Sequence, residues 1–463
     1  VRFLLAFTTS DWYWACVLMS LNIFFPLVLL LDALKQKVLK MRGIETDQAN
    51  FSPWVKSVVK VLESRSITSI LCKVNLLCEL YFTLFIGVAK VTSVFLSWLN
   101  EMLLGLDLGV VMAVFFVIGF LMFLAPPVPG IPVYICSGIV IAERAKTTDV
   151  GYVGGIGLAV TLSFVLKLTA VAGQYAIGFF LAKSVKIQQL VGVDKVATRS
   201  VEKILLQKGL TMSKAAVLVG GPDWPTSVLC GILKLNLFQC ILGTVPVILV
   251  SSPCVVAGAL MVGSTVAATT TTLSPSNSTM DLGPPSSPKE QIWSALSSTA
   301  LGISAITQLA SGILALYYIQ EVIIADGEEL AKHRPEHDPV LTLTQKEQEY
   351  VAAYAAVTQW HRLGRPKQLL LVGGTAMNVA STGALILLDT TIFRPFAVSN
   401  RMSDSFDNGG LENNALNLVR LPGWIALGAF SLACFMHFFF SRMVFFSVER
   451  YLRSLTQVSP APS

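Results

Sequence analysis

Charged residues are scarce in this chain. Asp, Glu, Lys and Arg make up 13% of its 463 residues, about half of the share in soluble domains, while hydrophobic residues make up 54%. A chain with so little charge and so much apolar surface is neither a water-soluble domain nor an intrinsically disordered one. Its 33 glycines are too few for a collagen-like repeat.

Catalytic and metal-binding motifs are lacking as well. The eight cysteines form no Cys-x-x-Cys pair and lie mostly in apolar runs, which favours reduced, packed thiols. His333 to His337 spells the His-x-x-Glu-His string of some metalloproteases, but Pro335 interrupts the helix that this chemistry needs. We therefore expect a solvated loop there, and neither an enzyme nor a bound cofactor or metal.

Long apolar runs are abundant. Seven of them approach the roughly 20 residues that cross a bilayer, namely 12–34, 108–125, 150–182, 236–266, 293–318, 369–389 and 422–447. The segment 66–104 is also apolar, but four charged residues interrupt it, so it forms either two short spans or one long interfacial helix. The sequence predicts an all-α polytopic membrane protein with seven to nine transmembrane helices.

Basic residues indicate the orientation. Lys and Arg collect in 35–65 and 183–214, which places both loops in the cytosol and requires 66–104 to cross zero times or twice. The net charge of +6 is assigned to such loops rather than to nucleic-acid binding. The same count of membrane crossings puts Asn277, in the sequon Asn277-Ser278-Thr279, in the lumen, and it puts 320–367 and the C-terminus in the cytosol.

Two Pro-rich apolar segments are too irregular for ordinary spans. They read Pro126-Pro127-Val128-Pro129-Gly130-Ile131-Pro132 and Gly220-Gly221-Pro222-Asp223-Trp224-Pro225. At an offset of 93 residues they align, with Pro129 on Pro222, Pro132 on Pro225 and Gly138 on Gly231. Either these segments form a structural repeat, or they are two unrelated Pro-rich loops between spans.

The repeat predicts two re-entrant hairpins. Each motif precedes about ten apolar residues, which rise only about 15 Å as a helix, half of the hydrocarbon thickness. Pro132 and Pro225 suit the first turn of such half-helices. Because the span 150–182 separates the two units, they should enter from opposite faces, as in the inverted repeats of secondary transporters.

At these segments the chain resembles the DedA / SNARE-associated Golgi protein family, whose shared unit is called the VTT domain. The resemblance covers roughly 105–265 and rests on Pro126 to Gly130 with Gly138, on the Gly-rich span 151–178, and on Gly221-Pro222 with Gly231. It implies two re-entrant hairpins that face each other. It also implies phospholipid scrambling in the endoplasmic reticulum for eukaryotic members, and transport of phosphorylated lipid carriers for bacterial ones.

Two departures from the bacterial pattern bear on the activity. Bacterial members carry a glutamate close to the first Pro-Gly and an arginine just before the second hairpin. Here Ile131 follows Gly130, and the run Val217-Leu218-Val219 precedes Gly220. The departures favour the activity implied for eukaryotic members over proton-coupled transport.

Three candidate residues carry alternative interpretations. Lys167 lies near the middle of its span, where a charge costs about 2.5 to 3.5 kcal/mol on insertion scales. It either attracts lipid phosphate in a cavity or snorkels from a tilted helix. Asp223 either balances Lys167 and takes part in headgroup transit or caps the following half-helix. Trp224 either gates the cavity or anchors at the interface.

The leading hypothesis is an endomembrane protein of the endoplasmic reticulum or Golgi that moves phospholipids between leaflets without energy input. The alternatives are an ion-coupled transporter of a phosphorylated lipid or small anion, with Asp223 or Glu143 as the proton site, and a non-transporting trafficking scaffold that docks a cytosolic partner at 320–367. The predicted lipid pathway comprises Pro129, Gly130, Pro132, Gly138, Glu143, Lys167, Gly221, Pro222, Asp223, Trp224, Pro225 and Gly231.

The chain is expected to divide into four parts. Residues 1–104 hold an N-terminal span, a basic loop and the ambiguous apolar segment, and 105–266 form the VTT-like core. Residues 267–292 form a lumenal polar loop, and 293–463 add three spans with the cytosolic loop 320–367 between them.

Overall fold

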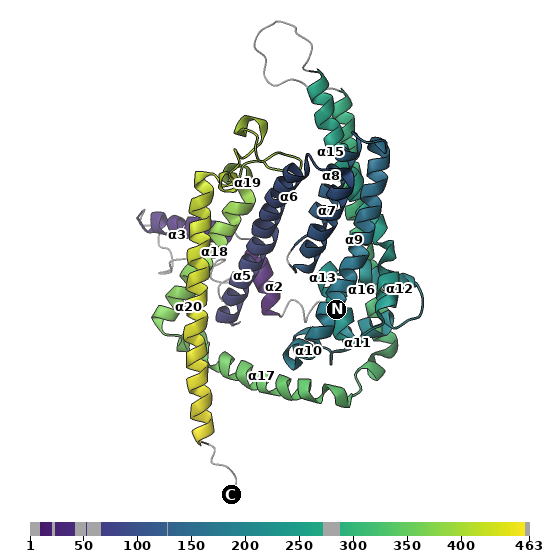
Figure 1. The fold of residues 1–463 in the computed structure, drawn as a ribbon. Coiled ribbons are helices and arrows are strands. Elements are labelled where there is room, and N and C mark those ends of the chain that lie inside the picture. Colours follow the sequence, from purple (N-terminus) through teal and green to yellow (C-terminus); the bar gives the residue numbers. More distant parts are fainter. Residues whose placement is uncertain are drawn as a thin grey trace. The chain divides into compact units, whose positions relative to one another are not determined.

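The computed structural model describes residues 10–20, 24–41, 52, 66–126, 128–271 and 288–458. Pro127 of the first motif and the predicted glycosylation site Asn277 lie outside the described residues. Within the described ranges the regular structure is helical, apart from one isolated antiparallel bridge between Phe393 and Val419. The chain forms two compact units, each built from segments that are distant in the sequence (Figure 1).

The first unit comprises Val1–Gly87, Lys346–Pro395 and Leu416–Ser463. Its helices are α2 (Asp11–Ser20), α3 (Phe24–Met41), α5 (Ile67–Tyr81), α18 (Arg365–Leu387), α19 (Asp389–Ile392) and α20 (Leu421–Val458). Helix α18 packs against α20 and α5, and α5 also packs against α2. Helix α17 (Asp338–Val357) runs from the second unit into the first.

The second unit comprises Val88–Gln345 and Phe396–Ala415, and it contains both Pro-rich motifs. Its helices are α6 (Ala89–Leu103), α7 (Leu108–Leu124), α8 (Gly130–Ala145), α9 (Gly151–Leu181), α10 (Val185–Val191), α11 (Val196–Leu205), α12 (Met212–Gly220), α13 (Asp223–Ile232), α14 (Leu237–Thr244), α15 (Ile248–Thr271) and α16 (Pro288–Leu330). Helices α8, α9 and α15 lie side by side (Figure 1).

Six helices of the described residues are long and apolar enough to cross a membrane. They are Ile67–Leu103, Gly151–Leu181, Leu237–Met261, Ile292–Leu330, Arg365–Leu387 and Leu421–Leu455. The chain is therefore an all-α integral membrane protein. Five of the seven spans expected from the sequence are among these helices; the expected span 108–125 is α7, a shorter apolar helix.

Of the two alternatives for 66–104, the structure shows one continuous helix, Ile67–Leu103, and not two short spans. Its length and composition allow a single crossing, which the distribution of basic residues disfavours. A π-helical turn at Phe82–Val88 joins α5 to α6. The charges that interrupt the hydropathy do not end the helix, because they find partners within their own units. Lys73 pairs with Asp11 at 3.2 Å, and Glu79 lies 2.9 Å from His437 Nδ1.

The expected span 12–34 covers most of α2 and the first part of α3, and neither helix is among the six. Residues 21–23 between the two helices lie outside the described residues.

The two Pro-rich motifs form two helical hairpins in the same register. Helix α7 turns into α8 at Pro129, and α12 turns into α13 at Gly221-Pro222. Pro129 and Pro222 directly precede α8 and α13 and have extended backbone angles, while Pro132 and Pro225 lie in the first turns. Proline fits both places because the first backbone N–H groups of a helix have no acceptor within it.

Helix α9 shows that the hairpins approach from opposite ends. Near its start, a Cβ on Gly155 would lie 3.1 Å from Ala142 Cα, close to the open end of the first hairpin. Near its end, Gly178 touches the Val228 carbonyl at the open end of the second. These two glycines are about 35 Å apart along the axis. Both turns therefore lie at intermediate heights on α9.

The aligned glycines occupy equivalent places. A Cβ on Gly138 of α8 would collide with the Val255 carbonyl of α15, and a Cβ on Gly231 of α13 would lie 2.7 Å from Phe179 N of α9. The second helix of each hairpin thus packs with close backbone contact against a longer helix, α8 against α15 and α13 against α9. Close packing of this kind stabilises helix pairs within membranes.

Gly178→Ala should separate α9 from α13 and lower the thermal unfolding temperature of the purified protein, because the new methyl group meets the Val228 carbonyl and Gly231 Cα. Gly157→Ala on the same helix is the matched control, since nothing lies within 4 Å of its Cβ. We expect a cost of about 1–3 kcal/mol for Gly178→Ala and no loss for Gly157→Ala. Equal melting of the two variants would contradict the close packing.

Candidate functional site

A buried ion pair lies where the second hairpin turns. Lys167, on the middle of α9, donates from Nζ to Asp223 Oδ1, the first residue of α13. Lys167 is only 2% exposed, whereas the Asp223 side chain is 46% exposed. The ammonium also lies 5.5 Å from the centre of the Phe123 ring. One side of this pair is sealed in protein and the other remains open.

This geometry decides between the alternatives for both residues. Lys167 neither snorkels nor presents an uncompensated charge, because its ammonium is buried and paired. The capping alternative for Asp223 is wrong: Pro222 occupies the N-cap position, and no side chain caps the helix. The carboxylate instead balances Lys167, as the sequence allowed.

Two further hydrogen bonds tie the turns together. Trp224 Nε1 donates to the Leu124 carbonyl at 3.1 Å, and Gln174 Nε2 donates to the Phe123 carbonyl at 2.7 Å. The last carbonyls of a helix have no partner within it, and burying them unpaired is costly. Side chains of α13 and α9 therefore satisfy the end of α7. Through its bond Trp224 joins the two hairpins.

Eight of the other predicted pathway residues build the hairpins. Six shape the turns and the first turns of the helices that follow, namely Pro129, Gly130, Pro132, Gly221, Pro222 and Pro225, while Gly138 and Gly231 permit close helix packing. Glu143 is separate: it lies on the last turn of α8, about 20 Å along the helix from Gly130, and pairs with Lys146 at 2.5 Å. The structure does not bring Glu143 to the ion pair.

An apolar cavity of about 630 Å³ lies beside the second turn. Gly221, Pro222, Pro225 and Thr226 line it from the hairpin, and Gly312 lines it from α16. Gln308 Nε2 on α16 donates to the Val219 carbonyl at 2.9 Å and so closes the end of α12. The cavity is large enough for part of a lipid chain.

Two buried cations were not predicted from the sequence. Lys214, assigned there to a basic loop, is fully buried in α12 and donates to the Gln207 carbonyl, to the Gly209 carbonyl at 3.1 Å and to Gln239 Oε1 at 3.2 Å. All three donors of this ammonium are satisfied. No sequence signal separates such a lysine from its exposed neighbours, because its acceptors are backbone carbonyls and a distant glutamine.

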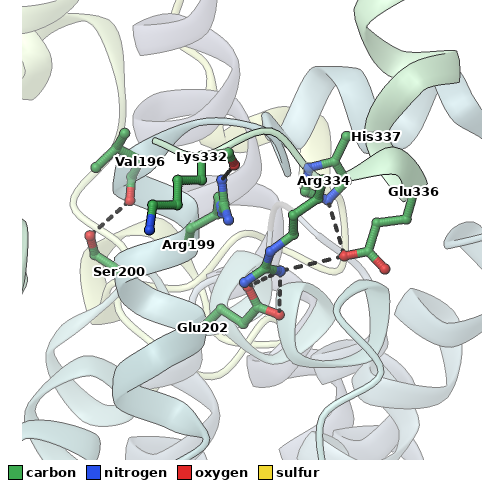
Figure 2. Close-up of polar contacts among 8 residues, drawn as sticks. All are labelled: Val196, Arg199, Ser200, Glu202, Lys332, Arg334, Glu336 and His337. Atoms are coloured by element: carbon green, nitrogen blue, oxygen red, sulfur yellow. Dashed lines mark hydrogen bonds and ion pairs between the residues drawn. The ribbon is translucent and has the colours of Figure 1, made fainter. Parts of the chain in front are cut away.

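Arg199 on α11 is the second buried cation, at 5% exposure (Figure 2). Its Nη1 donates to the Lys332 carbonyl at 2.7 Å, while Arg334 nearby bonds Glu202 at 3.1 Å. Burial lowers the pKa of Arg199, and Arg334 lowers it further, but a guanidinium stays protonated at neutral pH. Arg199 therefore places a permanent charge at the junction of α11 and the end of α16.

The His-x-x-Glu-His string has a different geometry from a zinc helix. Pro335–His337 form a 3-10 turn, His333 Nε2 lies 3.0 Å from Asp338 Oδ1, and His337 lies beside Glu336. The two imidazoles thus contact separate carboxylates. The described residues contain no group of three or more His, Cys, Asp and Glu side chains that could hold a metal ion.

The ion pair predicts unequal effects of removing its partners. Asp223→Asn leaves a buried ammonium without a counter-charge and should cost about 3 kcal/mol. Lys167→Met leaves a carboxylate that is nearly half exposed, so we expect about 1 kcal/mol. The double variant should recover most of the loss. Thermal unfolding of the purified variants checks this order, with Lys186→Met, an exposed lysine, as the control.

A double variant whose loss equals the sum of the single losses would show that the two side chains do not interact. It would also remove the reason for the second turn to lie at this height on α9.

Comparisons of the chain with protein-family models, with curated proteins and with solved structures found no match. The resemblance to the DedA / SNARE-associated Golgi protein family stays a prediction from the two motifs.

Proposed function

We propose that this protein is a phospholipid scramblase of the endoplasmic reticulum or Golgi, which lets lipids cross between leaflets without energy input. The observation that carries the proposal is the meeting of two helical hairpins at the ion pair on the middle of α9. In this reading both hairpins are re-entrant, enter from opposite faces of the bilayer, and bring polar groups to its centre.

The pathway would combine the Lys167–Asp223 ion pair with the apolar cavity beside the second turn. The open side of Asp223 and the ion pair behind it offer a lipid headgroup electrostatic partners where hydrocarbon offers none. The cavity beside Pro222 and Pro225 accepts part of an acyl chain, and α16 exposes Leu309 and Ile313 to the surrounding lipid. The headgroup would thus cross beside protein while the tails stay in an apolar environment.

Coupled transport of a phosphorylated lipid or small anion is the second candidate. The ion pair favours it in one respect, because Asp223 is a half-exposed carboxylate held in a membrane protein by a buried cation. Protonation of Asp223 would release Lys167 for an anionic substrate. Glu143 takes no part in this version, since it pairs with Lys146 at the other end of α8. A trafficking scaffold that uses 320–367 would carry no lipid at all.

Gly312→Phe tests the proposed pathway. Gly312 lines the cavity, and a Cβ there would lie 3.4 Å from the Gly220 carbonyl, so a phenyl ring enters the cavity without moving the backbone far. In liposomes with a fluorescent phospholipid and an external quencher, wild-type protein should expose the inner-leaflet lipid, and Gly312→Phe should slow this at least tenfold.

Gly302→Phe on the same helix is the matched control, since its Cβ meets nothing within 4 Å. It should leave the rate unchanged. Flux that appears only with an ion gradient would favour coupled transport, and absence of flux with and without a gradient would favour the scaffold. Equal rates in wild type and Gly312→Phe would contradict passage beside this cavity.

A further inference from the structure

Arg199 is a buried cation without a carboxylate partner. Its Nη1 is bound to the Lys332 carbonyl, but its Nε is buried and has no hydrogen-bond partner. No acidic side chain of the described residues lies within ion-pair distance of it. Nη2 makes no hydrogen bond to the described residues and, unlike Nε, is not sealed in protein, so it is the guanidinium nitrogen left for another acceptor.

This side chain lines a polar cavity of about 360 Å³ between α11 and the end of α16. Figure 2 shows Arg199 with Lys332, Arg334 and Glu202. Arg199, Lys203, Lys332 and Arg334 are the cations that line it, and Glu202 and Glu329 are its acids. The volume exceeds that of a few water molecules and is sufficient for a phosphate group.

Both acids of the cavity are already engaged. Glu202 accepts from Arg334 at 3.1 Å, and Glu329 lies 3.5 Å from Lys203. Lys203 is held more closely by Asp326, at 3.0 Å, and this contact raises its pKa. Arg199 and the exposed ammonium of Lys332 remain without a carboxylate among the described residues. Lys203 and Arg334 each contact two carboxylates, whereas Arg199 and Lys332 make no such contact in the described part of the chain.

Lys214 shows how the same unit treats a buried cation that needs no ligand. Protein oxygens satisfy all three of its donors, so the site is closed. A guanidinium nitrogen that no protein oxygen satisfies can gain a charge-assisted hydrogen bond from a bound anion. The contrast separates a structural cation at Lys214 from an open one at Arg199.

We propose that this cavity binds a phosphoryl group, with Nη2 of Arg199 and the ammonium of Lys332 as its donors. A tetrahedral phosphoryl group offers several oxygens on one centre, so it can accept from both cations at once, and it carries the negative charge that neither cation contacts. The group belongs either to a soluble phosphate or to a phosphorylated lipid headgroup. The proposal does not rest on lipid scrambling, because the cavity and the ion pair share no residue.

Thermal unfolding of the full chain in neutral detergent tests the site, with inorganic phosphate titrated against chloride at constant ionic strength. A second titration uses micelles doped with phosphatidylinositol 4-phosphate against micelles doped with phosphatidylinositol. Binding to the folded state raises the unfolding temperature with ligand concentration. We expect such a rise, with at least a tenfold higher half-saturating concentration in Arg199→Gln and in Lys332→Gln.

Lys332→Gln keeps the test decisive if Arg199→Gln does not fold, since it changes an exposed side chain and retains the carbonyl that Arg199 uses. Lys208→Gln, an exposed cation outside the cavity, is the control and should respond as wild type does. A rise with inorganic phosphate assigns the site to a soluble anion, and a rise only with the phosphorylated lipid assigns it to a headgroup. No rise with either, or an equal rise in all variants, would overturn the proposal.

Discussion

One buried ammonium constrains the second unit more than any other group. Lys167 is sealed on the middle of α9, and a charge in that position needs a counter-charge from within the protein. The counter-charge comes from Asp223 at the start of α13, so the second hairpin must turn at the height of Lys167. That turn then carries Trp224 to the end of α7 and supplies the partner that the Leu124 carbonyl needs.

Close backbone contacts hold the hairpins in this position. Gly138 sets α8 against α15, and Gly231 with Gly178 sets α13 against α9. Without a hydrophobic force between helices in lipid, contacts that permit dense packing supply much of the association energy. Gly138 and Gly231 are equivalent, so in both hairpins a helix that begins near a proline packs closely against a longer helix. The ion pair and the Trp224 hydrogen bond, together with these close glycine contacts, hold the same two turns in place.

The sequence predicts the helical class and the register of the two hairpins well, because both depend on local signals. Proline and glycine restrict the backbone wherever they occur, so Pro132 and Pro225 mark first turns without knowledge of the fold. The sequence leaves two alternatives open for 66–104, two short spans or one long helix, because hydropathy counts Lys73 and Glu79 as interruptions. In the fold these charges pair with Asp11 and His437, and the helix is continuous.

Partners distant in the sequence explain the other omissions. Arg199 is buried against a carbonyl 133 residues away, and Lys214 against a glutamine 25 residues away. Charge patterning alone assigns both to a solvated loop. The sequence predicts that Asp223 either pairs with Lys167 or caps a helix. The position of α13 along α9 is needed to choose between these roles, and it brings Asp223 to Lys167.

In the proposed arrangement the two hairpins enter the bilayer from opposite faces, and labelling from one side of the membrane tests this. Asp149 follows the first hairpin and Lys208 precedes the second, and both are exposed. Cys16 is the one exposed native cysteine in the described part of the chain, so Cys16→Ser provides the background for Asp149→Cys and Lys208→Cys. In sealed vesicles of uniform orientation, a membrane-impermeant maleimide should label one of these variants from outside and the other only after permeabilisation. Labelling of both from the same side would contradict the account.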